Sequence, residues 1–284
     1  MKTYQRSSIA VCGLGVIGGS LALALRRRGV RVAGIDADPA TLTLARRRGA
    51  VSSATSSIAD GVRDAAVVVL AVPVQSLARC MRAVAAAARP DAVITDTTSV
   101  KAPVLALAHR LLPMPGRFVG GHPMAGRETS GFAHARPDLY RGRVCVVTPV
   151  AGTSGRAVRT VERLWRAAGA RVIRMSPRRH DAAAARASHL PHLVAWALAP
   201  VLGDRDARQL VSGSFLDSTR VAASDPALWE GILLANRSEV LRAARAQATR
   251  MSRLLRLVRA NRAGPLKREL GAAARLRRRA EARK

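Results

Sequence analysis

The glycine-rich stretch that begins at residue 13 constrains the fold of this chain more than any other feature. It follows directly on an apolar run at residues 8–12, which has the pattern of a buried strand, and it leads into a helix-like run at residues 21–25. In such a strand–turn–helix unit, one glycine permits the tight turn, one lets backbone N–H groups approach a pyrophosphate, and one lets the helix pack on the strand. The motif predicts a dinucleotide-binding loop formed by Gly13, Gly15, Val16, Ile17 and Gly18.

A carboxylate at the end of the second expected strand indicates which dinucleotide binds. Residues 30–35 have a strand pattern and are followed by Asp36, at the distance from Gly18 that is typical of a ribose-binding acid. A carboxylate there accepts hydrogen bonds from the ribose hydroxyls and repels a 2′-phosphate. We therefore expect NAD. NADP stays open as an alternative, because the many arginines could supply a partner for a phosphate.

Further strands alternate with helices, which predicts an α/β fold with a Rossmann domain at the N-terminus. Residues 66–72 form an uninterrupted apolar run that ends with Val72 and Pro73, and residues 92–95 form another strand pattern. Ligands of such sheets bind beyond the carboxyl ends of the strands. We expect Val72 and Pro73 to contact the cofactor, and Pro73, Ser99 and His122 to border one crevice.

His122 is the strongest candidate for a catalytic group. It lies between two glycines and a proline, in a loop that also contains Glu128, and a histidine side chain can accept a proton near neutral pH. The alternative is an ordinary turn that contains one histidine. Ser99 could orient His122 or a substrate hydroxyl, or it could cap a following helix. We expect Lys101 to be a solvated charge or a phosphate contact.

The second part of the chain is predicted to be entirely helical. Two further strand patterns, at residues 143–148 and 171–175, flank a helix pattern at 158–168, and no convincing strand follows residue 177. We therefore divide the chain into a Rossmann domain (1–176) and a helical domain (177–284). The helical half is too narrow to bury its own apolar stripes fully, which predicts a homodimer. The basic stretch at 253–284 is expected to be solvated and partly frayed.

Composition limits the class of protein. The chain has 284 residues and a net charge of +30, which would ordinarily indicate nucleic acid as a partner. The basic residues are nearly all arginine and are spread along the chain, so we attribute the charge to compositional bias and expect no nucleic-acid role.

The three separated cysteines predict neither disulfides nor a metal site. No run resembles a signal peptide or a membrane span, so we expect a cytoplasmic protein.

Two polar segments of the helical part are candidates for substrate binding. In Ser188-His189-Leu190-Pro191-His192 the two imidazoles fall on one face of a helix, but no third ligand for a metal is evident. Downstream, Asp217 and Arg220 are spaced to pair, and the guanidinium of Arg220 matches a carboxylate. A surface ion pair is the competing interpretation.

These motifs together resemble the prephenate and arogenate dehydrogenase family. The resemblance is carried by Gly13–Ser20, Asp96-Thr97-Thr98-Ser99-Val100-Lys101, Gly121-His122-Pro123-Met124-Ala125-Gly126-Arg127-Glu128-Thr129-Ser130-Gly131, Ser188–His192 and Phe215–Trp229, in this order across most of the chain. It implies a Rossmann domain followed by a helical dimerisation domain, without an appended regulatory domain or a fused mutase.

The resemblance also implies a reaction and a role for each matching residue. His122 would accept a hydrogen bond from the ring C4 hydroxyl of the substrate as hydride passes to NAD, and the ring carboxylate would leave as CO2. The other implied roles are as follows: Ser99 positions His122 and the hydroxyl, Arg220 binds a substrate carboxylate, His192 contacts the substrate side chain, Trp229 supports Arg220, and Glu128 and Asp217 belong to a polar network at the entrance. Leu216 and Arg127 differ from the residues expected there, which leaves the side-chain preference open.

The sequence leaves three functions open. The first is oxidative decarboxylation of prephenate with NAD. The second is the same reaction on arogenate or an amino-substituted prephenate, whose enzymes share the motifs. The third, from another class, is a basic nucleic-acid-associated binding protein, which would depend on the basic C-terminal stretch alone.

Overall fold

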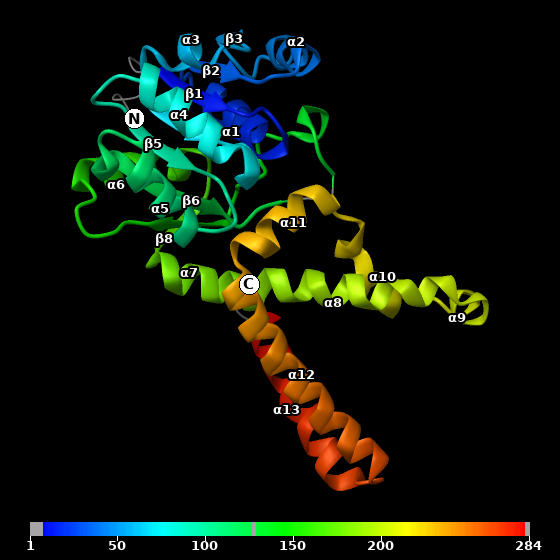
Figure 1. Cartoon of the computed structure of the whole chain (residues 1–284). Coiled ribbons are helices and arrows are strands. Elements are labelled where there is room, and N and C mark those ends of the chain that lie inside the picture. Colours follow the sequence, from blue (N-terminus) through cyan, green and yellow to red (C-terminus); the bar gives the residue numbers. More distant parts are fainter. Residues whose placement is uncertain (1–7, 127–128, 282–284) are drawn as a thin grey trace. The chain divides into compact units, whose positions relative to one another are not determined.

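A mainly parallel sheet forms the centre of the N-terminal part of the protein (Figure 1). The structure is a computed structural model that describes residues 8–126 and 129–281. In the sheet the strands are arranged in the order β3-β2-β1-β4-β5-β6-β7-β8. Their bounds are β1 Ser8–Cys12, β2 Val32–Ile35, β3 Ser53–Thr55, β4 Ala65–Leu70, β5 Val93–Asp96, β6 Phe118–Pro123, β7 Val144–Thr148 and β8 Arg171–Arg174. The α/β fold with a Rossmann-like N-terminal part is confirmed, and β3 is a strand that the sequence did not predict.

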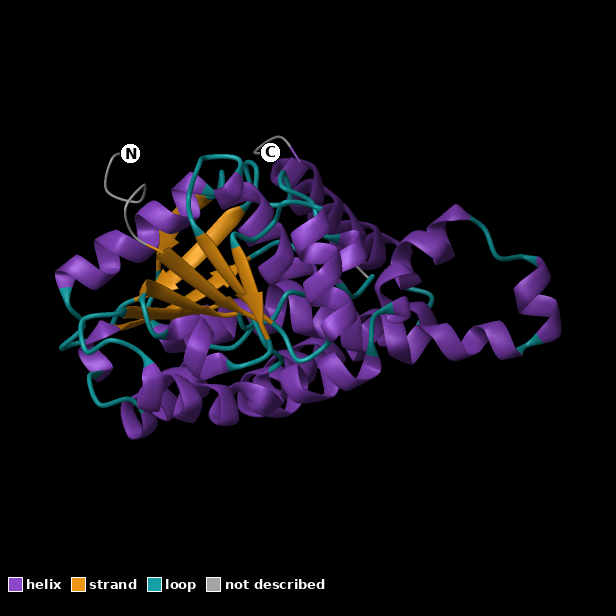
Figure 2. Cartoon of the chain, turned by 90° about the horizontal axis from the view of Figure 1, so that it is seen from above, coloured by secondary structure: helices purple, strands orange, loops and turns teal. Residues whose placement is uncertain are grey.

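Helices cover both faces of the sheet (Figure 2). Alternate residues of β1 enter different cores: Ile9 and Val11 belong to one buried cluster, and Ala10 and Cys12 to the other. This alternation follows from the two-residue period of a strand, and burial on both faces explains why these strands read as continuous apolar runs. The cysteines at positions 12, 80 and 145 are free and buried.

The helices follow the strands in the order that a doubly wound sheet requires. Those of the sheet region are α1 Val16–Arg26, α2 Pro39–Arg47, α3 Ile58–Val62, α4 Leu77–Ala87, α5 Ala102–Leu111 and α6 Gly155–Ala167. After β8 the described chain is helical: α7 Pro177–Ala184, a π-helical turn η4 (Ala185–His189), α8 Leu190–Leu198, α9 Arg205–Gln209, α10 Gly213–Thr219, α11 Pro226–Ala235, α12 Arg237–Arg259 and α13 Ala263–Glu281.

Strand β6 differs from the loop that the sequence predicted around His122. Its first residues pair with β5 in parallel, and the stretch from Gly120 to Pro123 pairs with β7 in antiparallel fashion. His122 is therefore a strand residue opposite Val146. Because β4, β5 and β6 run in parallel, their carboxyl ends lie at the same edge of the sheet, so His122 is held at that edge by backbone hydrogen bonds on a rigid strand.

The chain divides into two compact units, residues 1–237 and 238–284. The change from mixed to helical structure occurs between Arg174 and Pro177. The first unit extends beyond that point because α11 packs Trp229 and Ile232 into one of the two cores. A functional boundary at residue 176 stays a proposal.

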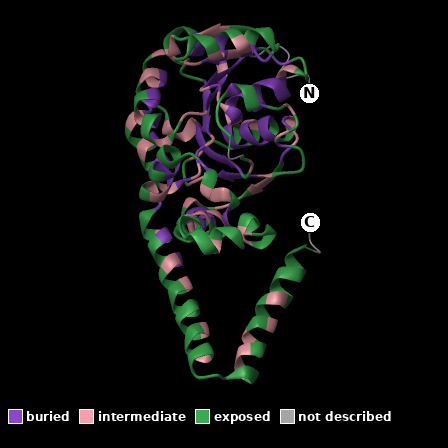
Figure 3. Cartoon of the chain, turned by 90° about the vertical axis from the view of Figure 1, so that its right-hand side faces the viewer, coloured by how far each residue is buried: buried purple, intermediate pink, exposed green. Residues whose placement is uncertain are grey.

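In the second unit, α12 and α13 are joined by a turn and by an ion pair between Arg253 and Glu269. The turn contains Asn261 with φ 49°, a left-handed conformation that asparagine tolerates. The predicted frayed end is wrong for residues 263–281, which form a helix. Pro265 does not interrupt it, because proline is accommodated in a first helical turn. Most side chains of this helix are exposed (Figure 3).

Among the described residues, no helix has the length and apolar character needed to span a membrane.

Candidate active site

The glycine loop between β1 and α1 is shaped so that side chains are excluded at two of its glycines. Gly13 has φ +92°, and a Cβ there would lie 2.4 Å from the Ala71 carbonyl oxygen. A Cβ on Gly18 would lie 1.9 Å from the Gly13 carbonyl oxygen. Gly15, in contrast, faces open space, and no side chain caps the N-terminus of α1. The first-turn N–H groups of that helix can therefore receive an anion.

Asp36 stands beside this loop, as the sequence predicts. One carboxylate oxygen accepts a hydrogen bond from the Leu14 backbone N–H at 2.7 Å, and the other accepts from the Asp38 N–H at 3.0 Å. Each oxygen has a second lone pair that a ribose hydroxyl can use. Val72 lies on the other side of the loop, where a Cβ on Gly13 would touch it, and exposed Pro73 follows. A dinucleotide fits this loop: its pyrophosphate would meet Gly15 and Val16, and its ribose Asp36.

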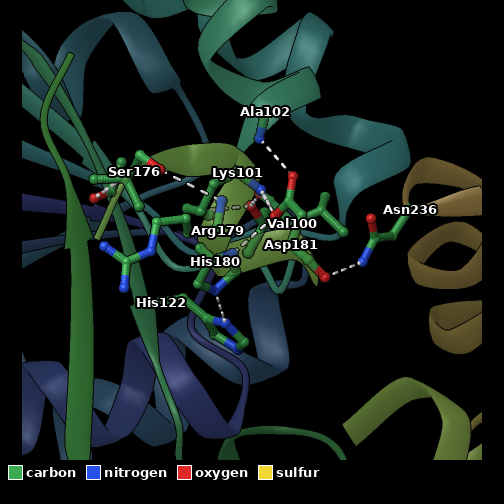
Figure 4. Close-up of polar contacts among 12 residues, drawn as sticks. Val100, Lys101, Ala102, His122, Ser176, Arg179, His180, Asp181 and Asn236 are labelled. Atoms are coloured by element: carbon green, nitrogen blue, oxygen red, sulfur yellow. Dashed lines mark hydrogen bonds and ion pairs between the residues drawn. The ribbon is translucent and has the colours of Figure 1, made fainter. Parts of the chain in front are cut away.

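His122 is buried, with 7% of its surface exposed, at the carboxyl edge of the sheet. Its Nδ1 lies 2.8 Å from Nε2 of His180 in α7, and the Nδ1 of His180 lies 2.7 Å from an oxygen of Asp181 (Figure 4). The two rings meet edge to face. One nitrogen of His122 is therefore engaged by the protein, which leaves Nε2 as the atom for a substrate.

The surroundings of His122 favour its neutral form. Burial lowers the pKa of His122 well below the ordinary value of 6.5, and the charges of His180, Lys101 and His189 lower it further. A neutral imidazole can act as a proton acceptor. The pKa shift therefore keeps the group in the state that a general base requires at physiological pH.

Lys101 is not the solvated charge or phosphate contact that the sequence suggested. Its side chain is fully buried, where it pairs with Asp96 and donates to the Gly121 carbonyl at 2.6 Å. Burial lowers the pKa of Lys101, while the charge of Asp96 opposes that shift. The prediction failed because Gly121 lies on β6, twenty residues further along the chain, and a buried charge is stable only when the fold brings such a partner to it.

A cluster of aromatic and histidine side chains in the helical part includes His192 and Trp229, which the sequence analysis proposed for the site. His192 in α8 stacks on Trp229 in α11, with ring centroids 3.6 Å apart. His189 meets the same indole edge-on, and Asn236 approaches its Nδ1 at 3.1 Å. Both histidines of the Ser188–His192 motif thus face Trp229, as their spacing predicts. Burial lowers the pKa of His189 to about 4.

The remaining predicted residues lie on separate segments. Ser99 is half-buried between β5 and α5, Asp217 is exposed on α10, and Arg220 is exposed just after that helix. Glu128 lies outside the described residues. His122 contacts His180, and Trp229 contacts His192. The roles expected of Ser99 and Arg220 stay proposals.

Sequence reasoning missed two residues that contact the site. His180 and Asp181 stand in an arginine-rich helical stretch, and nothing but their adjacency marks them in the sequence. The fold brings them to His122 because α7 begins directly after β8 and Asp181 binds the N–H groups at the start of α5 (Figure 4). Within residues 8–126 and 129–281, no group of three or more His, Cys, Asp or Glu side chains could hold a metal ion.

Two known protein families match the chain. The family described as "Prephenate dehydrogenase, nucleotide-binding domain" matches residues 21–174, and "Prephenate dehydrogenase, dimerization domain" matches residues 176–272. The two matches together cover most of the chain and meet where β8 gives way to α7. The glycine loop lies just before the first match.

Individual relatives agree with these matches. A prephenate dehydrogenase of Bacillus subtilis is 35% identical over 245 residues, which are 84% of this chain and 66% of the relative. The chain thus spans slightly less than two thirds of that protein. A cyclohexadienyl dehydrogenase of Zymomonas mobilis is 35% identical over 241 residues, 82% of each chain.

Solved structures extend the similarity to the whole fold. A prephenate dehydrogenase from A. aeolicus, in complex with hydroxyphenyl propionate and NAD⁺, has a TM-score of 0.90 and 32% identity, covering 95% of this chain and 97% of the other. A Synechocystis arogenate dehydrogenase has a TM-score of 0.82 and 29% identity, covering 95% and 98%.

Proposed function

Because the chain belongs to the prephenate dehydrogenase family, we propose that it oxidises prephenate with NAD and releases the ring carboxylate as CO2. The observation that carries the proposal is the position of His122, a buried and neutral imidazole at the sheet edge where β4 and β5 also end. The glycine loop and Asp36 lie at the ends of β1 and β2, in the arrangement that binds a dinucleotide.

In the proposed reaction, His122 takes the proton of the C4 hydroxyl through Nε2. NAD, when bound, supplies the acceptor for the hydride that leaves C4. The bond to the ring carboxylate then breaks, and its electron pair makes the ring aromatic as CO2 departs. His122 returns its proton to the resulting phenolic oxygen, so no proton is gained or lost overall. General base catalysis of this kind contributes about a hundred- to ten-thousandfold in rate.

A substrate with two carboxylates needs fixed polar partners besides the base. We assign one carboxylate to the guanidinium of Arg220, which can bind it through two parallel hydrogen bonds. His192 would contact the substrate side chain, supported by its stacking on Trp229. The remaining assignments follow the family resemblance: Ser99 to the hydroxyl and His122, Trp229 to the support of Arg220, and Asp217 with Glu128 to the entrance.

The helical part is assigned to dimerisation. The match to a dimerization domain at residues 176–272 supports a homodimer, and so do apolar side chains that one copy leaves exposed. Leu198, Val201 and Leu202 near the end of α8 are each more than one third exposed. A cytoplasmic location stays a prediction from the sequence.

One assay separates the open substrates and cofactors. NADH or NADPH formation is followed with NAD or NADP, each paired in turn with prephenate, arogenate and a 4-amino-substituted prephenate. We expect turnover with NAD and prephenate. Turnover only with arogenate, or with a 4-amino-substituted prephenate, would move the protein to the alternative of the same family; a relative from Streptomyces pristinaespiralis bears the name 4-amino-4-deoxyprephenate dehydrogenase. No reduction of either cofactor with any of these substrates would contradict the proposal.

A further inference from the structure

The contacts behind His122 form a chain that starts at the N-terminus of α5 (Figure 4). There the two carboxylate oxygens of Asp181 accept hydrogen bonds from the backbone N–H groups of Lys101, at 2.7 Å, and Ala102, at 2.8 Å. These donors belong to the first turn of a helix, where the helix dipole also favours a negative charge. The position of Asp181 is thus fixed from α5.

Asp181 is held in its ionised form. Burial raises the pKa of Asp181, but the hydrogen bonds from His180, Ala102 and Lys101 outweigh burial and leave the pKa below its ordinary value. An ionised carboxylate can only accept hydrogen bonds. The Nδ1 of His180, 2.7 Å from Asp181, must therefore carry the proton of that contact.

The position of the proton on His180 determines its position on His122. A neutral imidazole has one protonated nitrogen, so the Nε2 of His180 is an acceptor when its Nδ1 is the donor. That acceptor lies 2.8 Å from Nδ1 of His122, and the contact is a hydrogen bond only if the Nδ1 of His122 carries the proton. The lone pair of His122 is then on Nε2. All three side chains are buried, so bulk water does not compete for these contacts.

We propose that Asp181 and His180 are positioning residues that place the proton of His122 on Nδ1 and so reserve Nε2 for the substrate hydroxyl. The proposal deepens the function proposed above and rests on it for the identity of the reaction. In the opposite tautomer, Nε2 would carry a hydrogen and could not take the hydroxyl proton. When His122 becomes protonated, its Nδ1–H bond to His180 also stabilises the imidazolium.

The kinetic test compares two substitutions of His180. His180→Gln can keep a carbonyl oxygen where Nε2 accepts, whereas His180→Leu offers no acceptor. We expect kcat with prephenate to fall about a hundredfold in His180→Leu and less than about tenfold in His180→Gln, with KM changed less than about threefold in both. His109→Leu, at an exposed position on α5, is the control and should leave kcat unchanged. Equal losses in the Gln and Leu variants would overturn the proposal.

A spectroscopic test does not depend on turnover or on a folded Leu variant. NMR spectra of protein labelled with ¹⁵N in histidine, assigned with His122→Asn, report which ring nitrogen carries the proton. We expect the proton on Nδ1 in the wild type. A wild-type His122 protonated on Nε2 would overturn the proposal. The expected tautomer in a protein that does not oxidise prephenate would instead contradict only the proposed function.

Discussion

Asp96 and Lys101 bind the backbone N–H and carbonyl groups of Gly121, the residue next to His122. Asp96 accepts from the Gly121 N–H at 3.0 Å, and Lys101 donates to the Gly121 carbonyl. Two opposite charges that are buried together are stable only with such additional hydrogen bonds, and these bonds leave the strand little freedom. At the residue scale, the position of the proposed base is thus set by a buried ion pair on one side and by His180 on the other.

Arg220 is the residue whose proposed role is most open to test. Replacing it with alanine should raise KM for prephenate about tenfold or more and change kcat less, because a carboxylate contact made equally in ground and transition states contributes to binding. Steady-state kinetics at saturating NAD measure both constants. Arg208→Ala, at another exposed arginine of the helical part, is the control. An unchanged KM would reduce Arg220 to a surface residue.

At the same scale, the sequence identified the candidates with a local signature and missed those without one. His122 was recognised from its glycine and proline neighbours, and Asp36 from its distance to Gly18. The burial of Lys101 could not be predicted, because its partner Gly121 becomes its neighbour only when β5 and β6 pair. His180 and Asp181 were missed for the same reason.

At the scale of elements, the space around the turn between β1 and α1 allows a specific prediction. Gly15 has room for a methyl group, so Gly15→Ala should fold with a stability change within about 0.5 kcal/mol. The methyl would occupy the space into which the pyrophosphate comes, so Kd for NAD should rise about tenfold, or about 1.4 kcal/mol. Calorimetric titration with NAD measures this. Gly203→Ala, also facing open space, should bind NAD normally; equal affinities for both variants would contradict the assignment of the loop.

Elements with a long apolar pattern were predictable, whereas β3 and α13 are examples of elements that were not. Strand β3 has three residues, none of them buried, so it carries no apolar run to detect. Helix α13 was taken for a frayed end because it is rich in arginine and contains Gly264 and Pro265. A glycine and a proline in the first turn cost a helix little, and arginine has a high helix propensity.

At the scale of the whole molecule, buried histidines tie stability to pH. The pKa values of His122, His189 and His192 are all lowered, chiefly by burial. Below the unfolded value near 6.5 the unfolded chain binds protons that the folded chain does not, so stability falls as pH falls. For His189, with a folded pKa of about 4, the loss between pH 7 and pH 5 is about 2 kcal/mol.

Urea denaturation at several pH values between 5 and 7 measures this dependence. In His189→Gln the free energy of unfolding should depend less steeply on pH, because one titrating group is gone. His109→Gln removes an exposed histidine and should keep the wild-type slope. Identical slopes for wild type and His189→Gln would contradict the effect of burial on His189.

The central claim, that His122 is the base of an NAD-dependent oxidation, is tested most directly by His122→Asn. NAD binding should be unchanged, because His122 lies on β6 and the glycine loop follows β1. The rate of NADH formation at saturating prephenate and NAD should fall about a hundredfold or more, since asparagine cannot take up the hydroxyl proton. A His122→Asn enzyme that forms NADH at nearly the wild-type rate would contradict the account.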